Sequence, residues 1–156
     1  MASLLAPGVK APFFSLPRNG GGRVSLSDFA SQNLVLYFYP KADTSGCTRE
    51  AQAFSALRPA FKAAATSILG VSADPVRALD KFVAKRELSI SLASDEAHQM
   101  LTAYGVWGQK SMYGRTYMGV IRSTFLIDRQ GRIARIWPKV SVEGHAEEVL
   151  AAAKAL

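Results

Sequence analysis

The run Leu34–Tyr39 is a continuous stretch of apolar and aromatic residues that stops at Pro40. A run of this length without alternating polar residues is typical of a strand buried on both faces. The run Ser67–Ser72 predicts a second strand of the same kind. Strands of this kind occur in α/β proteins, where helices cover both faces of the sheet.

The segments around these strands have helical or hairpin patterns. Helical spacing predicts a helix over 48–65 that contains Pro59, and Asp74 is expected to cap a helix that has Pro75 in its first turn. Further expected elements are a strand over 90–92, a helix from Ser94 through Tyr104, a hairpin of 123–128 and 132–137, and a closing helix over 141–156. We therefore expect one domain over residues 1–156, a three-layer α/β fold with a central mixed β-sheet flanked by helices.

Composition indicates the class of protein and its cellular compartment. With 49% hydrophobic and 20% charged residues, the 156-residue chain has the composition of an ordinary globular protein. A single cysteine excludes a disulfide framework and favours a reducing compartment. Because no signal-peptide pattern and no run of roughly 20 apolar residues occurs, we expect a cytoplasmic protein with no membrane partner.

The net charge of +7 raises the question of nucleic-acid binding. The basic residues are scattered, however, with the densest groups at 81–86 and 129–135, and no block of five like charges occurs. We interpret them as solvated surface and expect no nucleic-acid partner. Nucleic-acid binding stays as an alternative that would require salt-sensitive affinity.

Cys47 follows a short polar loop, at the point where a helix should begin. Free backbone N–H groups and the helix dipole favour a thiolate over a thiol at that place. The plainer alternative is a small buried apolar residue. His98 and His145 fall in expected helices, and we interpret both as surface or core packing residues. With one cysteine and no clustered carboxylates, we predict no metal site and no cofactor, and a Cys–His pair of the papain kind lacks any supporting hydrolase pattern.

The pattern Pro40-x-x-x-Thr44-x-x-Cys47, with Glu50 three residues later and Arg122 just before a strand, resembles the peroxiredoxins. The fuller strings 37–50 and 122–128 are similar to the peroxiredoxin Q branch, also called bacterioferritin comigratory proteins. The resemblance covers about Pro7 to Leu150 and implies a thioredoxin-like fold. It also implies thiol-dependent reduction of hydrogen peroxide and organic hydroperoxides, with Cys47 as the nucleophile.

Thiolate formation alone does not explain a fast peroxidase, since nucleophilicity falls as ionisation becomes easier; the site must also stabilise the breaking O–O bond. We expect the Thr44 hydroxyl to accept from the peroxide and donate to sulfur, and Arg122 to hold the thiolate and the leaving oxygen. Pro40 would shield the sulfur from water, and Glu50 would orient Arg122. The backbone N–H groups of Gly46 and Cys47 would face the peroxide.

Each of these side chains also has a plain structural interpretation. Thr44 could be a turn hydroxyl, Arg122 an ion-paired arginine, Pro40 a strand stop and Glu50 an acidic residue of a first helical turn. The Gly-rich segment 105–119 holds several aromatic residues and methionines. It could form an apolar wall for organic hydroperoxides or an ordinary packed loop.

Branch members with a resolving cysteine carry it where this chain has Gln52 or Val83, and Ser45 replaces the usual proline. The resemblance therefore implies a one-cysteine cycle in which an external thiol (thioredoxin, glutaredoxin or glutathione) reduces the sulfenic acid. We expect a monomer that can form a transient dimer through two Cys47 residues. The competing hypothesis is a non-catalytic redox sensor or holdase chaperone on the same fold.

Overall fold

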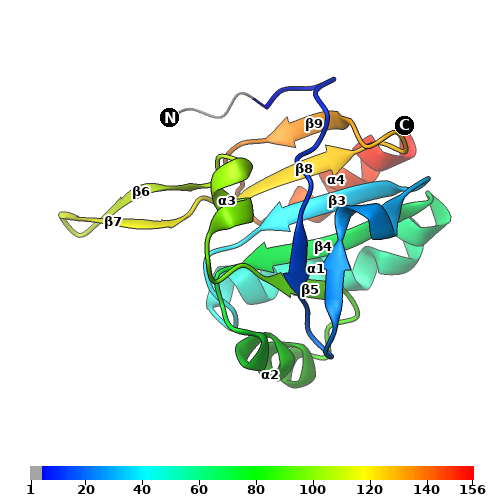
Figure 1. Cartoon of the computed structure of the whole chain (residues 1–156). Coiled ribbons are helices and arrows are strands. Elements are labelled where there is room, and N and C mark those ends of the chain that lie inside the picture. Colours follow the sequence, from blue (N-terminus) through cyan, green and yellow to red (C-terminus); the bar gives the residue numbers. More distant parts are fainter. Residues whose placement is uncertain (1–4) are drawn as a thin grey trace.

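A mixed five-stranded sheet forms the centre of the computed structural model, which describes residues 5–156 (Figure 1). The strand order is β5-β4-β3-β8-β9, and β3 pairs in parallel with β4 but antiparallel with β8. The bounds are β3 Asn33–Phe38, β4 Thr66–Ser72, β5 Ser91–Ser94, β8 Ser123–Ile127 and β9 Ile133–Trp137. The predicted mixed sheet and the hairpin of β8 and β9 are confirmed.

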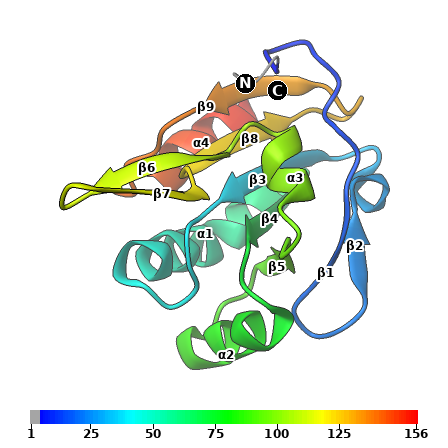
Figure 2. The ribbon, with the colours of Figure 1, turned by 60° about the vertical axis from the view of Figure 1, so that its left-hand side comes forward.

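Alternate residues of β3 face two separate apolar layers. Val35 and Tyr37 point toward the helices α1 (Ser45–Ala63), α2 (Val76–Arg86) and α4 (His145–Lys154). Leu36 and Phe38 point to the opposite face, which α3 (Gln99–Ala103), the pair β1 (Ser15–Pro17) and β2 (Arg23–Ser25), and the 3-10 helix η1 (Leu26–Phe29) help to cover (Figure 2). Every residue of β3 is buried, which confirms the three-layer prediction.

The Gly-rich segment forms an antiparallel hairpin of β6 (Trp107–Met112) and β7 (Arg115–Val120). Figures 1 and 2 show it projecting from the body of the molecule. Tyr113 at its tip is 97% exposed, and Met112, Tyr117 and Met118 are also exposed. The segment is therefore not the packed loop that was one of the two alternatives. Backbone hydrogen bonds between β6 and β7 hold it together, and most of its side chains stay exposed.

The helices α1 to α4 all begin at residues other than those predicted, and α1 begins at Ser45 rather than at Thr48. Pro75, not Asp74, caps α2, because the Asp74 carboxylate accepts hydrogen bonds from Ala42 N–H and from the Ser72 hydroxyl. α3 begins only at Gln99, since His98 precedes it in a left-handed conformation with φ of 62°. α4 begins at His145 rather than near 141, after Gly144 with φ of 74°. No helix among residues 5–156 is long and apolar enough to cross a membrane.

Candidate active site

The site lies where β3 passes into α1. The Tyr39 N–H still bonds to Val71 O at 3.1 Å, and the half-buried Pro40 then takes the chain out of the sheet. Thr44 is the N-cap of α1, and the first helical hydrogen bond runs from Thr48 N–H to Thr44 O at 2.8 Å. The N–H groups of the preceding residues, up to Cys47, therefore lie in the unpaired first turn of the helix.

Arg122 contacts two side chains of the first turns of α1, although it lies more than seventy residues later in the chain. It lies between β7 and β8, and its Nη2 donates to Cys47 Sγ at 3.3 Å while its Nη1 donates to Glu50 Oε1 at 2.5 Å. The Cys47 residue is only 1% exposed. Burial acts to lower the pKa of Arg122, but Glu50 and Cys47 outweigh it and raise that pKa, so the guanidinium stays a fixed cation.

Glu50 is a buried carboxylate with an unusual balance of forces. Burial raises the pKa of Glu50 to about 7, although Arg122 acts in the opposite direction. Its second oxygen, Oε2, is buried and has no hydrogen-bond partner within residues 5–156. Because no donor stabilises a negative charge on this buried oxygen, a proton can bind there near neutral pH.

The Thr44 hydroxyl donates to Lys41 O at 2.7 Å. The expected donation from Thr44 to sulfur is therefore absent from this structure, because the hydroxyl proton is donated to a carbonyl of the turn that precedes the helix. The Thr44 oxygen retains lone pairs that can accept from a ligand.

Gly46 is needed at the second helical position because Arg122 occupies the space beside it. A Cβ on Gly46 would lie 3.2 Å from Arg122 Nη2. A side chain here would push the guanidinium away from the sulfur. The geometry thus explains Gly46 as a packing requirement of Arg122 rather than as a special backbone conformation.

Two aspartates hold the loop between Pro40 and Thr44 in place. Asp43, with φ of 62°, accepts from Lys85 Nζ at 2.8 Å and from Arg86 Nε at 2.9 Å, both at the end of α2. Hydrogen bonds from these two cations lower the pKa of Asp43. Asp74 binds the Ala42 N–H at 2.8 Å. The sequence patterns that revealed Cys47 gave no signal for this clamp, because it joins residues about forty positions apart.

The two histidines, which were expected to be surface or core packing residues, bond or stack with side chains other than Cys47. His98 stacks on Trp107 with ring centroids 3.8 Å apart, and His145 Nε2 shares a hydrogen bond with Thr124 Oγ1 at 2.8 Å. Both histidines thus have other partners, which argues against a Cys–His pair. Within residues 5–156, no three His, Cys, Asp or Glu side chains gather as metal ligands.

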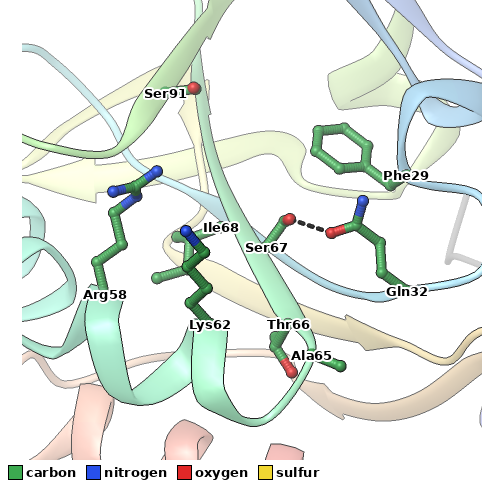
Figure 3. Close-up of a pocket in the computed structure, with 9 residues that line it drawn as sticks. All are labelled: Phe29, Gln32, Arg58, Lys62, Ala65, Thr66, Ser67, Ile68 and Ser91. Atoms are coloured by element: carbon green, nitrogen blue, oxygen red, sulfur yellow. Dashed lines mark hydrogen bonds between the residues drawn. The ribbon is translucent and has the colours of Figure 1, made fainter.

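A pocket of about 250 Å³ opens at the other end of β4 (Figure 3). Arg58 and Lys62 of α1 line it together with Ser67, whose hydroxyl donates to Gln32 Oε1. None of the predicted site residues lines this pocket.

Comparison with known proteins identifies the family of the chain. The AhpC/TSA family model matches residues 7–136. Peroxiredoxin Bcp of Xanthomonas campestris is 45% identical over 147 residues, covering 93% of this chain and 92% of that protein. Peroxiredoxin Bcp of Escherichia coli K12 is 42% identical over 146 residues, covering 94% of each chain. The chain is a peroxiredoxin.

Solved structures agree with this assignment. A cysteine-to-serine variant of Xylella fastidiosa PrxQ superposes with a TM-score of 0.93 at 39% identity, covering 99% of this chain and 98% of that one. The bacterioferritin comigratory protein of X. campestris, studied for alkyl peroxide reduction, superposes with a TM-score of 0.90 at 42% identity, covering 96% and 98%. The predicted resemblance to the Bcp or peroxiredoxin Q branch is confirmed. This peroxiredoxin is a thiol-dependent peroxidase with a thioredoxin-like fold.

The two places where branch members carry a resolving cysteine are filled differently here. Gln52 is exposed on α1, and Val83 is half-buried on α2, where it packs against the core. Since Cys47 is the single cysteine of the chain, no intramolecular disulfide can form in this peroxiredoxin.

Proposed function

We propose that this peroxiredoxin reduces hydrogen peroxide and organic hydroperoxides in a one-cysteine cycle, with Cys47 as nucleophile and Arg122 as the cation that stabilises the reacting oxygens. The observation that carries it is the Arg122 guanidinium, which contacts Cys47 Sγ and Glu50 Oε1 at once. Alkyl peroxide reduction by the X. campestris relative supports the organic substrate class.

In the first step the Cys47 thiolate attacks one peroxide oxygen. An S–O bond forms, the O–O bond breaks, and the leaving oxygen keeps the electron pair of that bond. The proton of the attacked hydroxyl passes to the leaving oxygen, which becomes water or an alcohol, and the sulfenate oxygen takes up one proton from solvent. Cys47 is oxidised to a sulfenic acid. The Thr44 oxygen accepts from the peroxide hydroxyl, while the unpaired N–H groups of Gly46 and Cys47 and the Arg122 guanidinium stabilise the developing negative charge.

Pro40 and Glu50 support this chemistry without reacting. Pro40 has no N–H and lies half-buried beside the loop, where it limits the access of water to the sulfur. Glu50 orients Arg122 through the 2.5 Å contact. Both are positioning residues in this scheme.

In the second step an external thiol attacks the sulfenic sulfur and releases water, which leaves a mixed disulfide. A second thiol then attacks that disulfide and restores the Cys47 thiolate. Because Cys47 is only 1% exposed, a thiol larger than a peroxide requires residues around the sulfur to move outward, and we propose that the loop 40–44 is the part that moves. Thioredoxin, glutaredoxin and glutathione are the candidate reductants.

We further propose that the chain acts as a monomer in the cytoplasm, without nucleic-acid or membrane partners. A lone thiol agrees with a reducing compartment. A disulfide between two Cys47 residues is the transient dimeric form. It would be visible as a covalent dimer in non-reducing mass spectrometry.

The test mixes the purified protein with excess hydroperoxide and a thiol reductant and counts peroxide equivalents consumed per chain. Many equivalents are expected for the wild-type chain and none above background for Cys47→Ser. Consumption of a single equivalent would favour the redox sensor, and equal turnover in Cys47→Ser would end the hypothesis.

A further inference from the structure

The pocket at the start of β4 has cations and polar groups on its walls (Figure 3). It opens between the last turns of α1, the starts of β4 and β5, and the residues that join η1 to β3. Of the described residues 5–156, no Asp or Glu lines it. Its volume of about 250 Å³ lies below the range of about 300–1,000 Å³ that is typical of pockets for drug-sized ligands. Size and lining together suit a small anion.

Arg58 and Lys62 give this pocket two positive charges. They are four residues apart on α1, so their side chains leave the same face of the helix. Within the described part of the chain, neither side chain has an ion pair or a hydrogen bond. The end of α1 carries only roughly half a negative elementary charge, which balances a small part of the two full charges. The pocket is therefore a place of uncompensated positive charge.

The carboxylate of the neighbouring cavity does not neutralise these cations. Asp128 lines that cavity, which shares two lining residues with this pocket. Its Oδ1 accepts from the N–H of Gln130 at 2.9 Å and from the N–H of Arg132 at 3.0 Å. The carboxylate is thus engaged by its own turn, and Arg129 in that turn adds another positive charge to the neighbouring cavity.

Two neutral groups on the pocket wall are also free to donate. The Ser67 hydroxyl donates to Gln32 Oε1, which leaves the N–H₂ group of the Gln32 amide without an acceptor among residues 5–156. The Ser91 hydroxyl likewise has no partner in that part of the chain. Thr66, in contrast, donates to Ala64 O at 3.0 Å. Free donors therefore reach the pocket from α1, from β5 and from the segment before β3.

We propose that this pocket binds a small tetrahedral oxyanion of the phosphate type. Phosphate presents oxygens in four directions and can accept from donors on three separate elements, whereas a carboxylate presents two oxygens in one plane. The planar Arg58 guanidinium can donate two parallel hydrogen bonds to such an ion, and Lys62 acts on it as a point charge. The site is separate from the peroxidase site, because Cys47 lies in the first turn of α1 and these two cations lie in its last two turns.

NMR titration of the ¹⁵N-labelled protein with inorganic phosphate tests this proposal, with chloride and acetate at matched ionic strength as reference anions. Saturable shifts confined to the amides of residues 65–68 and of Ser91 are expected with phosphate and not with the other two anions. Arg58→Met and Lys62→Met should each weaken phosphate binding by roughly 10-fold, the effect of losing one charge-assisted hydrogen bond. Both positions are exposed, so the amide spectrum of each variant should otherwise match that of the wild type.

The matched control is the double variant Arg77→Met/Lys81→Met. These residues are also exposed cations four positions apart on a helix, α2, but they do not line the pocket. The control should keep the wild-type affinity within about twofold, since distant exposed charges are screened by salt. Gln32→Glu keeps the shape of the pocket and adds a negative charge, so it should abolish binding.

Three results would overturn the assignment. One is a phosphate affinity in Arg58→Met and Lys62→Met equal to that of the control variant. Another is a set of shifts spread over the basic surface without saturation, which would mean general attraction of anions. The third is saturation by acetate at the same concentrations as phosphate, which would contradict a tetrahedral ligand. None of these measurements depends on peroxide turnover.

Discussion

Arg122 contacts more of the site residues than any other side chain described above. It touches Cys47 Sγ at 3.3 Å, holds Glu50 Oε1, and fills the space beside Gly46. A planar guanidinium with several fixed donors can serve all of these neighbours at once, whereas an ammonium cannot. The residue pattern identified Arg122 by resemblance, but only the structure shows why Gly46 accompanies it.

Removal of the guanidinium should therefore slow the peroxide step more than it affects folding. For Arg122→Ala we expect a loss of about 10²–10³-fold in the rate of peroxide reduction, the size seen when one fixed donor to a developing anion is deleted. Stopped-flow kinetics with hydrogen peroxide measures it. Arg135→Ala, which breaks the exposed Arg135–Glu148 pair, is the control and should react at the wild-type rate. Unchanged kinetics in Arg122→Ala would remove that residue from the mechanism.

Glu50 should give the reaction a pH dependence near neutrality. Because burial raises the pKa of Glu50 to about 7, the carboxylate loses its charge, and part of its hold on Arg122, as the pH falls through about 7. Glu50→Gln mimics the protonated form at all pH values. The ratio of its rate to that of the wild type should be well below one at pH 8 and approach one at pH 6. A ratio that stays constant across this range would contradict the role of Glu50.

At the scale of elements, the end of α2 controls the loop that precedes α1. Lys85 and Arg86 bind Asp43, whose left-handed conformation turns the chain toward Thr44. In the proposed cycle this loop opens to admit the reductant to Cys47, a residue that is only 1% exposed. The clamp stands near Val83, where branch members that form an internal disulfide carry their second thiol.

Asp43→Asn should loosen this clamp, while asparagine still tolerates the left-handed backbone. We expect the reaction of oxidised Cys47 with a bulky aromatic thiol to become a few-fold faster, because exposed ion pairs are weak. The rate with hydrogen peroxide should change less than twofold. Glu148→Gln, which breaks an exposed pair far from the loop, is the control. A slower thiol reaction in Asp43→Asn would show that the clamp guides the reductant rather than restrains the loop.

At the scale of the whole molecule, the core behind the site depends on close packing of Tyr37 across the sheet. The Tyr37 ring stacks on Phe54 of α1 at 4.7 Å and lies over Gly70 of β4. A Cβ on Gly70 would come within 2.7 Å of Tyr37 Cζ and 2.8 Å of Leu92 Cδ2. The parallel pair of β3 and β4 can form in this register only because Gly70 has no side chain.

Gly70→Ala should therefore destabilise the fold by about 1–3 kcal/mol, the usual effect of an extra methyl group in a packed core. Thermal unfolding should show a Tm lower by several degrees. Thr116→Ala, on the exposed hairpin, is the control and should change stability by less than about 0.5 kcal/mol. An unchanged Tm for Gly70→Ala would mean that Tyr37 can move aside at no cost.

The sequence alone determined the local order of the molecule. The uninterrupted run 34–39, the turn signal at 129–131 and the helical spacing after Cys47 are short-range patterns, and the structure reproduces β3, β8, β9 and α1 from them. Helix starts were less predictable. Asp74 was expected to cap a helix but accepts a hydrogen bond from the Ala42 N–H, and His98 was expected inside a helix but stacks on Trp107 ahead of it. Such contacts join residues that no local pattern relates.

The tertiary structure alone decided the charge arrangement of the site. It placed Arg122 against Cys47, tied Asp43 to α2 and turned 107–120 into a projecting hairpin. The physical reason is that spacing along the chain encodes backbone hydrogen bonds and burial over a few residues. Electrostatic interactions depend on distances in space, which exist only once β3, β7, β8, α1 and α2 have packed together.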